Sequence, residues 1–499
     1  MRKLLVAALV GWSLLTLGQG ADAQTQPGGT KIPGLEVAEF WAGVCPRYPP
    51  LEIDLNGDGH PDLLFPVCQR GRFKEYLPPE VGAQMGLIGA LMSMKADTGN
   101  KNFTMACALD GVTGKLLWEF QCGGLINEYA LSKDGSHLFL ASHDNHLYSI
   151  DTSSGKVAWG HDFGGNIMGM SSDADRMVAV TARNRVTAIG LKEGNVLWDI
   201  PVKVAVMSAG WGYFLSDGLS VFVSSLDNRV LCLDQATGTT RWSYTTQGNP
   251  SLRALVGKTL LIAEGQGLLA AVDTETGKSR WTYDTKGYPY LEPLSVSANL
   301  VSSFNGRNGS KARIFCVDLS SGTEKWAKPL EKIPSDSDRT IILPEDETLY
   351  RANLATKLGP DGVPVTLFMA DRKNLHALDP ASGAVQWSAP VNDTQLVFLG
   401  GELVLVQDRK KGVLCLEAVS GKSLWTAKVD KHIRQVVEDG GLFLCLQYNG
   451  TLLALESATG RQTVTVPLGE PNWIQPWRDG KILLSDHCGT SIIQPVPKQ

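Results

Sequence analysis

The sequence lacks a hydrophobic run long enough to cross a membrane. Its main apolar stretch, from Leu4 to Leu17, has 14 residues, whereas a transmembrane helix needs about 20. A strong excess of charge of one sign is also missing, since 46 lysines and arginines stand against 51 aspartates and glutamates. We therefore expect no transmembrane segment, and nothing in the charge balance favours nucleic acid as a partner.

Residues 1–23 are typical of a signal peptide. Arg2 and Lys3 precede the apolar stretch, and Ala-Asp-Ala at positions 21–23 supplies the small residues of a signal-peptidase site. Cleavage there would start the mature chain near Gln24 and change its formal charge from −5 to −6. The first cysteine is Cys45, so we expect no lipid anchor at the cleavage site. These features predict a periplasmic or secreted protein.

One short motif, first seen as "ALDGVTGKLLWEF" at residues 108–120, occurs nine times. Each copy has a turn glycine, and the glycines are Gly114, Gly155, Gly194, Gly238, Gly277, Gly322, Gly383, Gly421 and Gly460. Four residues before the glycine, every copy except that with Gly190 has an aspartate or glutamate. A period near 40 residues with strand-like flanks is typical of the four-stranded blades of a β-propeller.

Eight copies carry a tryptophan four residues after the glycine, and Val464 replaces it in the ninth. The tryptophans are Trp118, Trp159, Trp198, Trp242, Trp281, Trp326, Trp387 and Trp425. The acid can accept hydrogen bonds from the turn amides, and glycine allows the positive φ that such a turn requires. We expect each indole to cover the join between neighbouring blades, because so wide a side chain buries about 150–250 Å².

Segments between the motifs, such as "HLFLASHDNHLYSID", have two apolar runs around a polar turn and predict hairpins. No segment has the pattern of a long amphipathic helix, so the predicted fold class is all-β. Over about residues 104–466 the repeat resembles the pyrroloquinoline-quinone-type propeller repeat of quinoprotein dehydrogenases and of the outer-membrane barrel-assembly factor. That resemblance implies a β-propeller of eight four-stranded blades, although nine motifs and a strand-like tail leave nine or ten blades open.

The predicted organisation follows from these patterns. A linker over residues 24–44 follows the signal peptide, and residues 45–120 hold an acidic loop and the first blade. Residues 121–466 form further blades, and residues 467–499 supply C-terminal strands that close the ring. Two insertions, residues 70–103 and the 61-residue spacing between Gly322 and Gly383, are candidate partner-binding loops.

The acidic loop, "LEIDLNGDGHPDLLF", predicts a calcium site. Asp54, Asn56, Asp58 and Asp62 occupy positions 1, 3, 5 and 9 of the loop, and the carbonyl of His60 stands at position 7. Alternating oxygen side chains suit a hard cation that takes six to eight oxygens. The alternative is an Asx-rich turn that binds no metal. The pattern resembles the FG-GAP repeat of integrin-type propellers, which implies a structural calcium ion rather than a catalytic one.

The cysteines and histidines allow more modest expectations. Cys232, Cys316 and Cys415 precede their turn glycines by six residues, where other copies have alanine, so we expect buried, reduced thiols. Cys45 and Cys68 flank the acidic loop and are a candidate disulfide. His143 and His146 could suggest a metal pair, but a sibling blade has "SLDNR" at the same place, which favours a solvated turn.

Three functions are compatible with the sequence. A non-enzymatic scaffold that binds other proteins is the main prediction, by analogy with the barrel-assembly factor. A secreted or surface binder of glycans or other ligands is the alternative. A dehydrogenase that depends on pyrroloquinoline quinone is expected least, because quinone-binding members of that class have an adjacent cysteine pair and this sequence has none. We therefore expect calcium but not the quinone as a cofactor.

Overall fold

The fold is an all-β propeller, as the repeat predicts. The structure, a computed structural model, describes residues 31–32, 35–42, 45–46, 50–69, 104–173, 175–203, 214–265, 267–286, 295–297, 299–305, 312–330, 340–342, 354–358, 364–370, 373–392, 396–408, 410–429, 431–467, 473–477, 481–485 and 489–495. No helix occurs among these residues, and so none of them belongs to a helix long and apolar enough to span a membrane. The predicted signal peptide lies outside the described residues.

The described strands form ten sheets, which we number as blades in chain order. The strands of blades 1 to 3 are β3 (Cys45–Pro46), β4 (Leu51–Ile53), β5 (Asp62–Gln69), β6 (Thr104–Leu109) and β7 (Leu116–Gln121); β8 (Ile126–Leu131), β9 (His137–Ser142), β10 (His146–Asp151) and β11 (Val157–Asp162); and β12 (Ile167–Ser172), β13 (Arg176–Thr181), β14 (Arg185–Gly190) and β15 (Val196–Pro201).

Blades 4 to 6 repeat this pattern of four antiparallel strands. Their strands are β16 (Phe214–Ser216), β17 (Ser220–Ser225), β18 (Arg229–Asp234) and β19 (Thr240–Thr245); β20 (Ser251–Val256), β21 (Thr259–Glu264), β22 (Leu268–Asp273) and β23 (Ser279–Asp284); and β24 (Ser295–Ser297), β25 (Leu300–Asn305), β26 (Ala312–Asp318) and β27 (Glu324–Leu330).

Blades 7 to 9 complete the series of motifs, and blade 8 has an additional strand, β28, that pairs in parallel with β33. Their strands are β29 (Leu354–Leu358), β30 (Pro364–Ala370), β31 (Asn374–Leu378) and β32 (Val385–Pro390); β28 (Thr340–Ile342), β33 (Leu396–Gly400), β34 (Leu403–Asp408), β35 (Gly412–Glu417) and β36 (Ser423–Ala427); and β37 (Ile433–Asp439), β38 (Leu442–Gln447), β39 (Thr451–Glu456) and β40 (Gln462–Pro467).

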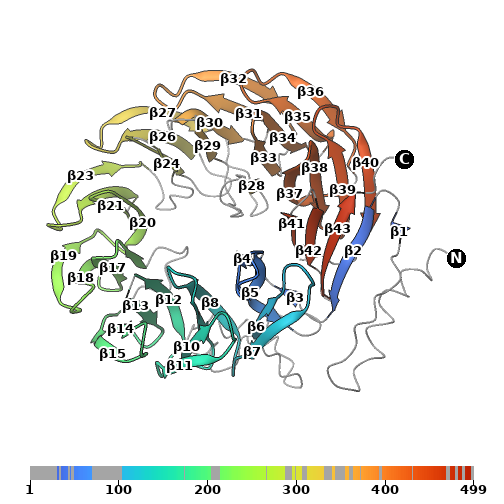
Figure 1. The fold of residues 1–499 in the computed structure, drawn as a ribbon. Coiled ribbons are helices and arrows are strands. Elements are labelled where there is room, and N and C mark those ends of the chain that lie inside the picture. The colour runs from blue at the N-terminus through green and yellow to red at the C-terminus, as the bar shows by residue number, and fades with distance from the viewer. Residues whose placement is uncertain are drawn as a thin grey trace, which may run out of the picture.

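Blade 10 joins the two ends of the described chain. It contains β1 (Lys31–Ile32), β2 (Leu35–Ala42), β41 (Trp473–Trp477), β42 (Lys481–Ser485) and β43 (Gly489–Pro495), in the order β1-β2-β43-β42-β41. The segment 24–44, predicted to be a linker, thus supplies two strands of the last sheet. Figure 1 shows β2, in blue, beside β43, in red.

The ten sheets stand around a common centre (Figure 1). Contacts of β3 with β43 and of β37 with β41 close the circle on both sides of blade 10. The described residues therefore give ten blades rather than the eight favoured from the sequence. The nine motifs account for nine of these blades, and the C-terminal strands together with β1 and β2 make the tenth.

The core lies between the blades rather than in one central cluster. One hydrophobic cluster joins Phe222 and Trp242 of blade 4 to Leu260 and Ile262 of blade 5, and equivalent clusters occupy other seams. Each sheet thus has two apolar faces, one for each neighbour. Stability therefore depends on side chains that bridge successive blades.

Candidate functional site

The indole of each motif tryptophan lies against the turn of the next blade. In all eight cases Nε1 donates a hydrogen bond to a backbone carbonyl three residues before the next turn glycine, for example from Trp118 to Thr152 at 2.7 Å and from Trp242 to Thr274 at 2.9 Å. The turn glycine packs directly on the same indole, because a Cβ added to Gly277 would lie 2.6 Å from Trp242. The structure thus places the tryptophans at eight consecutive seams.

The aspartate or glutamate of the motif stabilises the turn on which the indole of the preceding blade packs. The nine turn glycines have φ between 66° and 71°, in the left-handed region. Asp273 accepts hydrogen bonds from the amides of Glu275 and Thr276 at 3.1 and 2.8 Å. An ion pair with Arg280 contributes most to a pKa of about 2 for Asp273, which keeps that carboxylate charged at any physiological pH.

Among the described residues, neither seam beside blade 10 has a motif tryptophan. Val464 stands opposite Ala454 at the tryptophan position of blade 9, and Glu39 of β2 occupies the matching register position in blade 10. Between blades 9 and 10 a glutamine bridges the inner strands instead. Gln435 Nε2 donates to the carbonyl of Ile474 at 2.8 Å, and the amide of Ile474 donates to Gln435 Oε1 at 3.0 Å.

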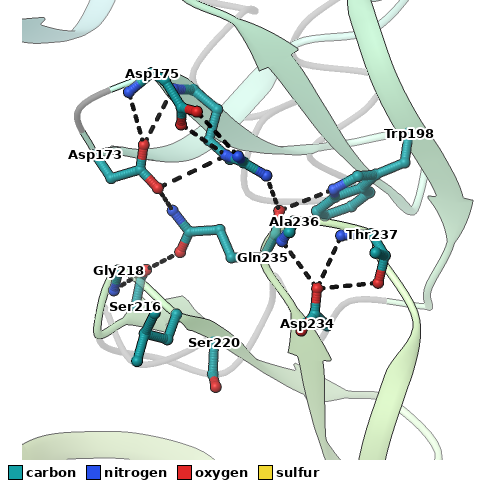
Figure 2. A network of polar contacts seen from close by, with 12 residues as sticks. Asp173, Asp175, Trp198, Ser216, Gly218, Ser220, Asp234, Gln235, Ala236 and Thr237 are labelled. Carbon is teal, nitrogen blue, oxygen red and sulfur yellow. Dashed lines mark hydrogen bonds and ion pairs between the residues drawn. The ribbon is translucent and has the colours of Figure 1, made fainter.

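An additional polar network strengthens the seam between blades 3 and 4 (Figure 2). Gln235, only 2% exposed, donates to Asp173 of blade 3 and accepts a hydrogen bond from Ser216 Oγ at 2.7 Å. Its carbonyl accepts hydrogen bonds from Trp198 Nε1 at 3.0 Å and Arg176 Nη1 at 3.3 Å. All these groups satisfy one another within the seam, so the network is structural in character.

The acidic loop connects β4 to β5 and brings three of its predicted ligands together. Asn56 Nδ2 lies 3.4 Å from Asp58 Oδ2 and 3.5 Å from Asp62 Oδ1. Asp54 instead accepts hydrogen bonds from the amides of Gly57 and Gly59 at 2.7 and 3.0 Å. For His60, the described contact is its amide, which donates to Asp58 Oδ1 at 2.8 Å.

The motif acid Asp110 also faces this loop, which sequence reasoning missed. Asn56 Nδ2 donates to Asp110 Oδ2 at 3.1 Å, and the amide of Gly111 donates to Asp62 Oδ1 at 2.9 Å. A hydrogen bond from the Thr113 amide is the main cause that lowers the pKa of Asp110, so that carboxylate is charged at neutral pH. Asp110 thus adds a further carboxylate beside the acidic loop.

In the part of the chain that the structure describes, no three or more histidine, cysteine, aspartate or glutamate side chains are arranged to hold a metal. His146 stacks on Tyr148 with ring centroids 5.5 Å apart, and its Nδ1 lies 2.9 Å from the carbonyl of Asp144. The amide of His143 donates to the carbonyl of Leu125 at 2.8 Å. Both histidines therefore lie at the turn between β9 and β10.

The cysteines occupy two kinds of position. Cys232, Cys316 and Cys415 are fully buried, each directly opposite its motif tryptophan, and burial raises the pKa of the Cys415 thiol to about 12. Such thiols stay protonated and unreactive. In blade 1, Cys68 Sγ lies 3.5 Å from Cys107 Sγ. The side chain of Cys45 lies outside the described residues, so its pairing with Cys68 stays a prediction.

The outer strands of blades 1 to 3 carry exposed apolar side chains just before their tryptophans. We call Leu116, Leu117, Val157, Val196 and Leu197 the apolar rim; their exposed fractions range from 36% to 48%. At the matching positions blades 4 to 6 instead have Thr240 and Arg241, Ser279 and Arg280, and Glu324 and Lys325. Figure 1 shows β7, β11 and β15 on successive blades of the circle.

This rim differs from a protected sheet edge. Outermost strands leave one row of backbone groups unpaired, and proteins usually guard such edges with charged side chains. Ion pairs protect this edge in blades 5 and 6. Arg280 pairs with Asp273 at 2.5 Å, and Lys325 pairs with Asp318 at 3.5 Å. Blades 1 to 3 have apolar side chains there on three successive blades, and Val385 of blade 7 and Leu424 of blade 8 are exposed in the same way, at 49% and 43%.

The geometry described so far defines a β-propeller built from tryptophan-linked repeats. A family model described as "Outer membrane protein assembly factor BamB" matches residues 99–204, 162–357 and 371–483, which together cover more than half of the chain. The chain therefore belongs to this family.

Solved structures with a similar fold include BamB from Moraxella catarrhalis, with 16% identity over 64% of this chain and 94% of that chain. They also include the computationally designed Ika8 protein, with 12% identity over 74% and 96%, and a europium-containing methanol dehydrogenase, with 14% identity over 73% and 85%. The TM-score is 0.38 in each case. A search of curated proteins finds no match.

Proposed function

We propose that the chain is an exported, non-enzymatic scaffold that binds other proteins through the apolar rim of blades 1 to 3. Membership of the assembly-factor family supports a role in protein interactions. The observation that carries the proposal is the row of exposed leucines and valines on three successive outer strands. An extended segment of a partner can pair with such an edge while its side chains contact the rim. The N-terminal sequence supports a periplasmic or secreted location.

Substitution of the rim tests this proposal. We expect the double variant Leu116→Arg and Val196→Arg to reduce partner recovery by about tenfold or more, because arginines in an apolar contact remove more than about 1.4 kcal/mol of binding free energy. The measurement is photo-crosslinking from position 117 in a cell-envelope extract, with adducts quantified by mass spectrometry.

The matched control is the double variant Thr240→Arg and Ser279→Arg, which makes the same change at the corresponding positions of blades 4 and 5. It should recover partners as the parent chain does, and a crosslinker at position 240 should give no specific adduct. Equal recovery by both double variants would refute the proposed rim. Binding to a glycan array that the rim variant abolishes would instead favour the ligand-binding alternative.

We propose further that the chain does not catalyse a quinone-dependent oxidation. The support is in the sequence, because the quinone-binding dehydrogenases that share this repeat have adjacent cysteines and no two cysteines are adjacent here. Fold alone does not decide the matter, since propellers serve both catalytic and non-catalytic proteins. A stable quinone chromophore on the purified chain, after incubation with quinone and calcium, would contradict this part of the proposal.

We propose the loop between β4 and β5 as a structural calcium site with the ligands predicted from the sequence, namely the side chains of Asp54, Asn56, Asp58 and Asp62 and the carbonyl of His60. We expect saturating calcium to raise the Tm of the EDTA-treated chain by about 2 °C or more, because an ion held by the folded state alone stabilises that state. Differential scanning calorimetry measures the shift. Asp58→Asn should remove it, since Asp58 is exposed and its loss leaves the backbone contacts of buried Asp62 in place.

Asp134→Asn is the control for the calcium experiment. Asp134 also holds an exposed turn, through Ser132 Oγ and Ser136 Oγ at 2.7 Å each, but it lies outside the loop. This variant should keep the full calcium response. A parent chain whose Tm does not respond to calcium would favour the interpretation of the loop as a metal-free Asx-rich turn.

A further inference from the structure

Two thiols meet in the interior of blade 1. Cys68 on β5 and Cys107 on β6 are both 0% exposed, and their Sγ atoms lie 3.5 Å apart. The strand register explains this proximity. Phe65 pairs with Cys107 and Cys68 with Met105, with an irregularity between Phe65 and Cys68. The two cysteines are thus diagonal neighbours on the same face of the sheet, where they pack with Leu483 of blade 10.

We infer that Cys68 and Cys107 form a disulfide in the exported protein. The bond requires a sulfur separation of about 2.05 Å, and the two sulfurs lie 3.5 Å apart on one face of the sheet. It would tie β5 to β6 and close the chain between two positions 39 residues apart. The inference rests on the proposed export, because disulfides persist in oxidising compartments and are rare in the cytosol.

The chemistry requires an oxidant, which we take to be an organic disulfide, RSSR. The thiolate of one cysteine attacks RSSR, forms a mixed disulfide and releases RS⁻. The second cysteine, as thiolate, then attacks the protein sulfur of the mixed disulfide and releases the other RS⁻. Two S–H bonds are replaced by one protein S–S bond, and two electrons and two protons pass to RSSR to give two RSH.

Burial sets the order of events. An external disulfide cannot approach thiols that are 0% exposed beneath Leu483. Oxidation therefore belongs to the stage of folding before blade 10 packs against blade 1. Cys232 and Cys316 lie in blades 4 and 6, and no other described cysteine shares their blade or their hydrophobic cluster. They serve as internal controls.

The test is to refold the denatured, reduced full chain in a glutathione redox buffer, block remaining thiols with iodoacetamide in urea, and map tryptic peptides without reduction. Trypsin places Cys45, Cys68 and Cys107 in separate peptides, 32–47, 48–70 and 102–115. We expect peptide 48–70 to be joined to peptide 102–115 by a disulfide. Alkylation of both peptides, or a join between 32–47 and 48–70, would overturn the inference; the latter would instead establish the pairing of Cys45 with Cys68.

Two serine variants distinguish a specific Cys68–Cys107 bond from a general folding defect. Cys45→Ser should retain the join, whereas Cys107→Ser should lose it. The oxidised parent chain should also unfold at a higher urea concentration than the reduced one, a difference that Cys107→Ser abolishes; an equal midpoint would count against a cross-link. Refolding in glutathione involves no partner, so its failure leaves the proposed scaffold untouched. A join formed in glutathione but absent from protein isolated from cells would overturn the inference as stated for the exported protein.

Discussion

Replacement of Trp242 by alanine is expected to lower the free energy of unfolding by about 3–5 kcal/mol. The indole is 9% exposed, lies 5.8 Å from the ring of Phe222 between centroids, and bonds to the carbonyl of Thr274. Truncation would open a cavity at the seam of blades 4 and 5 and leave that buried carbonyl without its donor. Urea denaturation followed by circular dichroism, together with the Tm, measures the loss.

Leu219→Ala is the matched control, because Leu219 belongs to blade 4 as well but is 71% exposed. It should change the free energy of unfolding by less than about 0.5 kcal/mol. A Trp242→Ala variant as stable as this control would mean that the indoles do not hold the blades together.

Replacement of Gly277 by alanine is expected to destabilise the same seam from the opposite side, by about 2–5 kcal/mol. Its φ of 68° disfavours any side chain, which costs about 1–2 kcal/mol. The new Cβ would also lie 2.6 Å from Cγ and Cδ2 of Trp242, and relief of that overlap costs about 1–3 kcal/mol more. The measurement is again the urea midpoint.

Gly257→Ala separates the two contributions. Gly257 also has a positive φ, of 54°, but a Cβ there meets no atom within 4 Å, so only the backbone cost of about 1–2 kcal/mol remains. In a double-mutant cycle, Trp242→Ala should reduce the effect of Gly277→Ala, because the overlap disappears with the indole. Equal losses for the two glycine variants, or strict additivity in the cycle, would contradict direct packing of the turn on the indole.

The repeated part of this fold could be predicted from the sequence because its determinants are local. Each acid, turn glycine and tryptophan lies within nine residues, and the structure gives all nine glycines the same backbone conformation. Blade 10 could not be predicted in the same way. Its strand β2 comes from the opposite end of the chain and carries Glu39 at the tryptophan position. No local pattern marks such a distant pairing.

The candidate sites likewise combine features that local spacing predicts with features that depend on tertiary structure. Spacing alone identified Asn56, Asp58 and Asp62 as neighbours, because they belong to one short loop. The approach of Asp110 to Asn56 depends on two separate hairpin turns meeting at the edge of blade 1. The proximity of Cys107 to Cys68 depends on an irregularity in strand register, which a sequence pattern does not reveal.

Because blade 10 combines strands from both ends of the described chain, it also determines when the ring can close during synthesis. β1 and β2 are the first described strands to be made, whereas β41, β42 and β43 are the last. Until residue 495 is available, β2 has no β43 to pair with, and blades 1 and 9 each leave one apolar face uncovered. The circle therefore closes only after β43 has been made, and a chain that stops before β43 would leave two apolar blade faces exposed to chaperones.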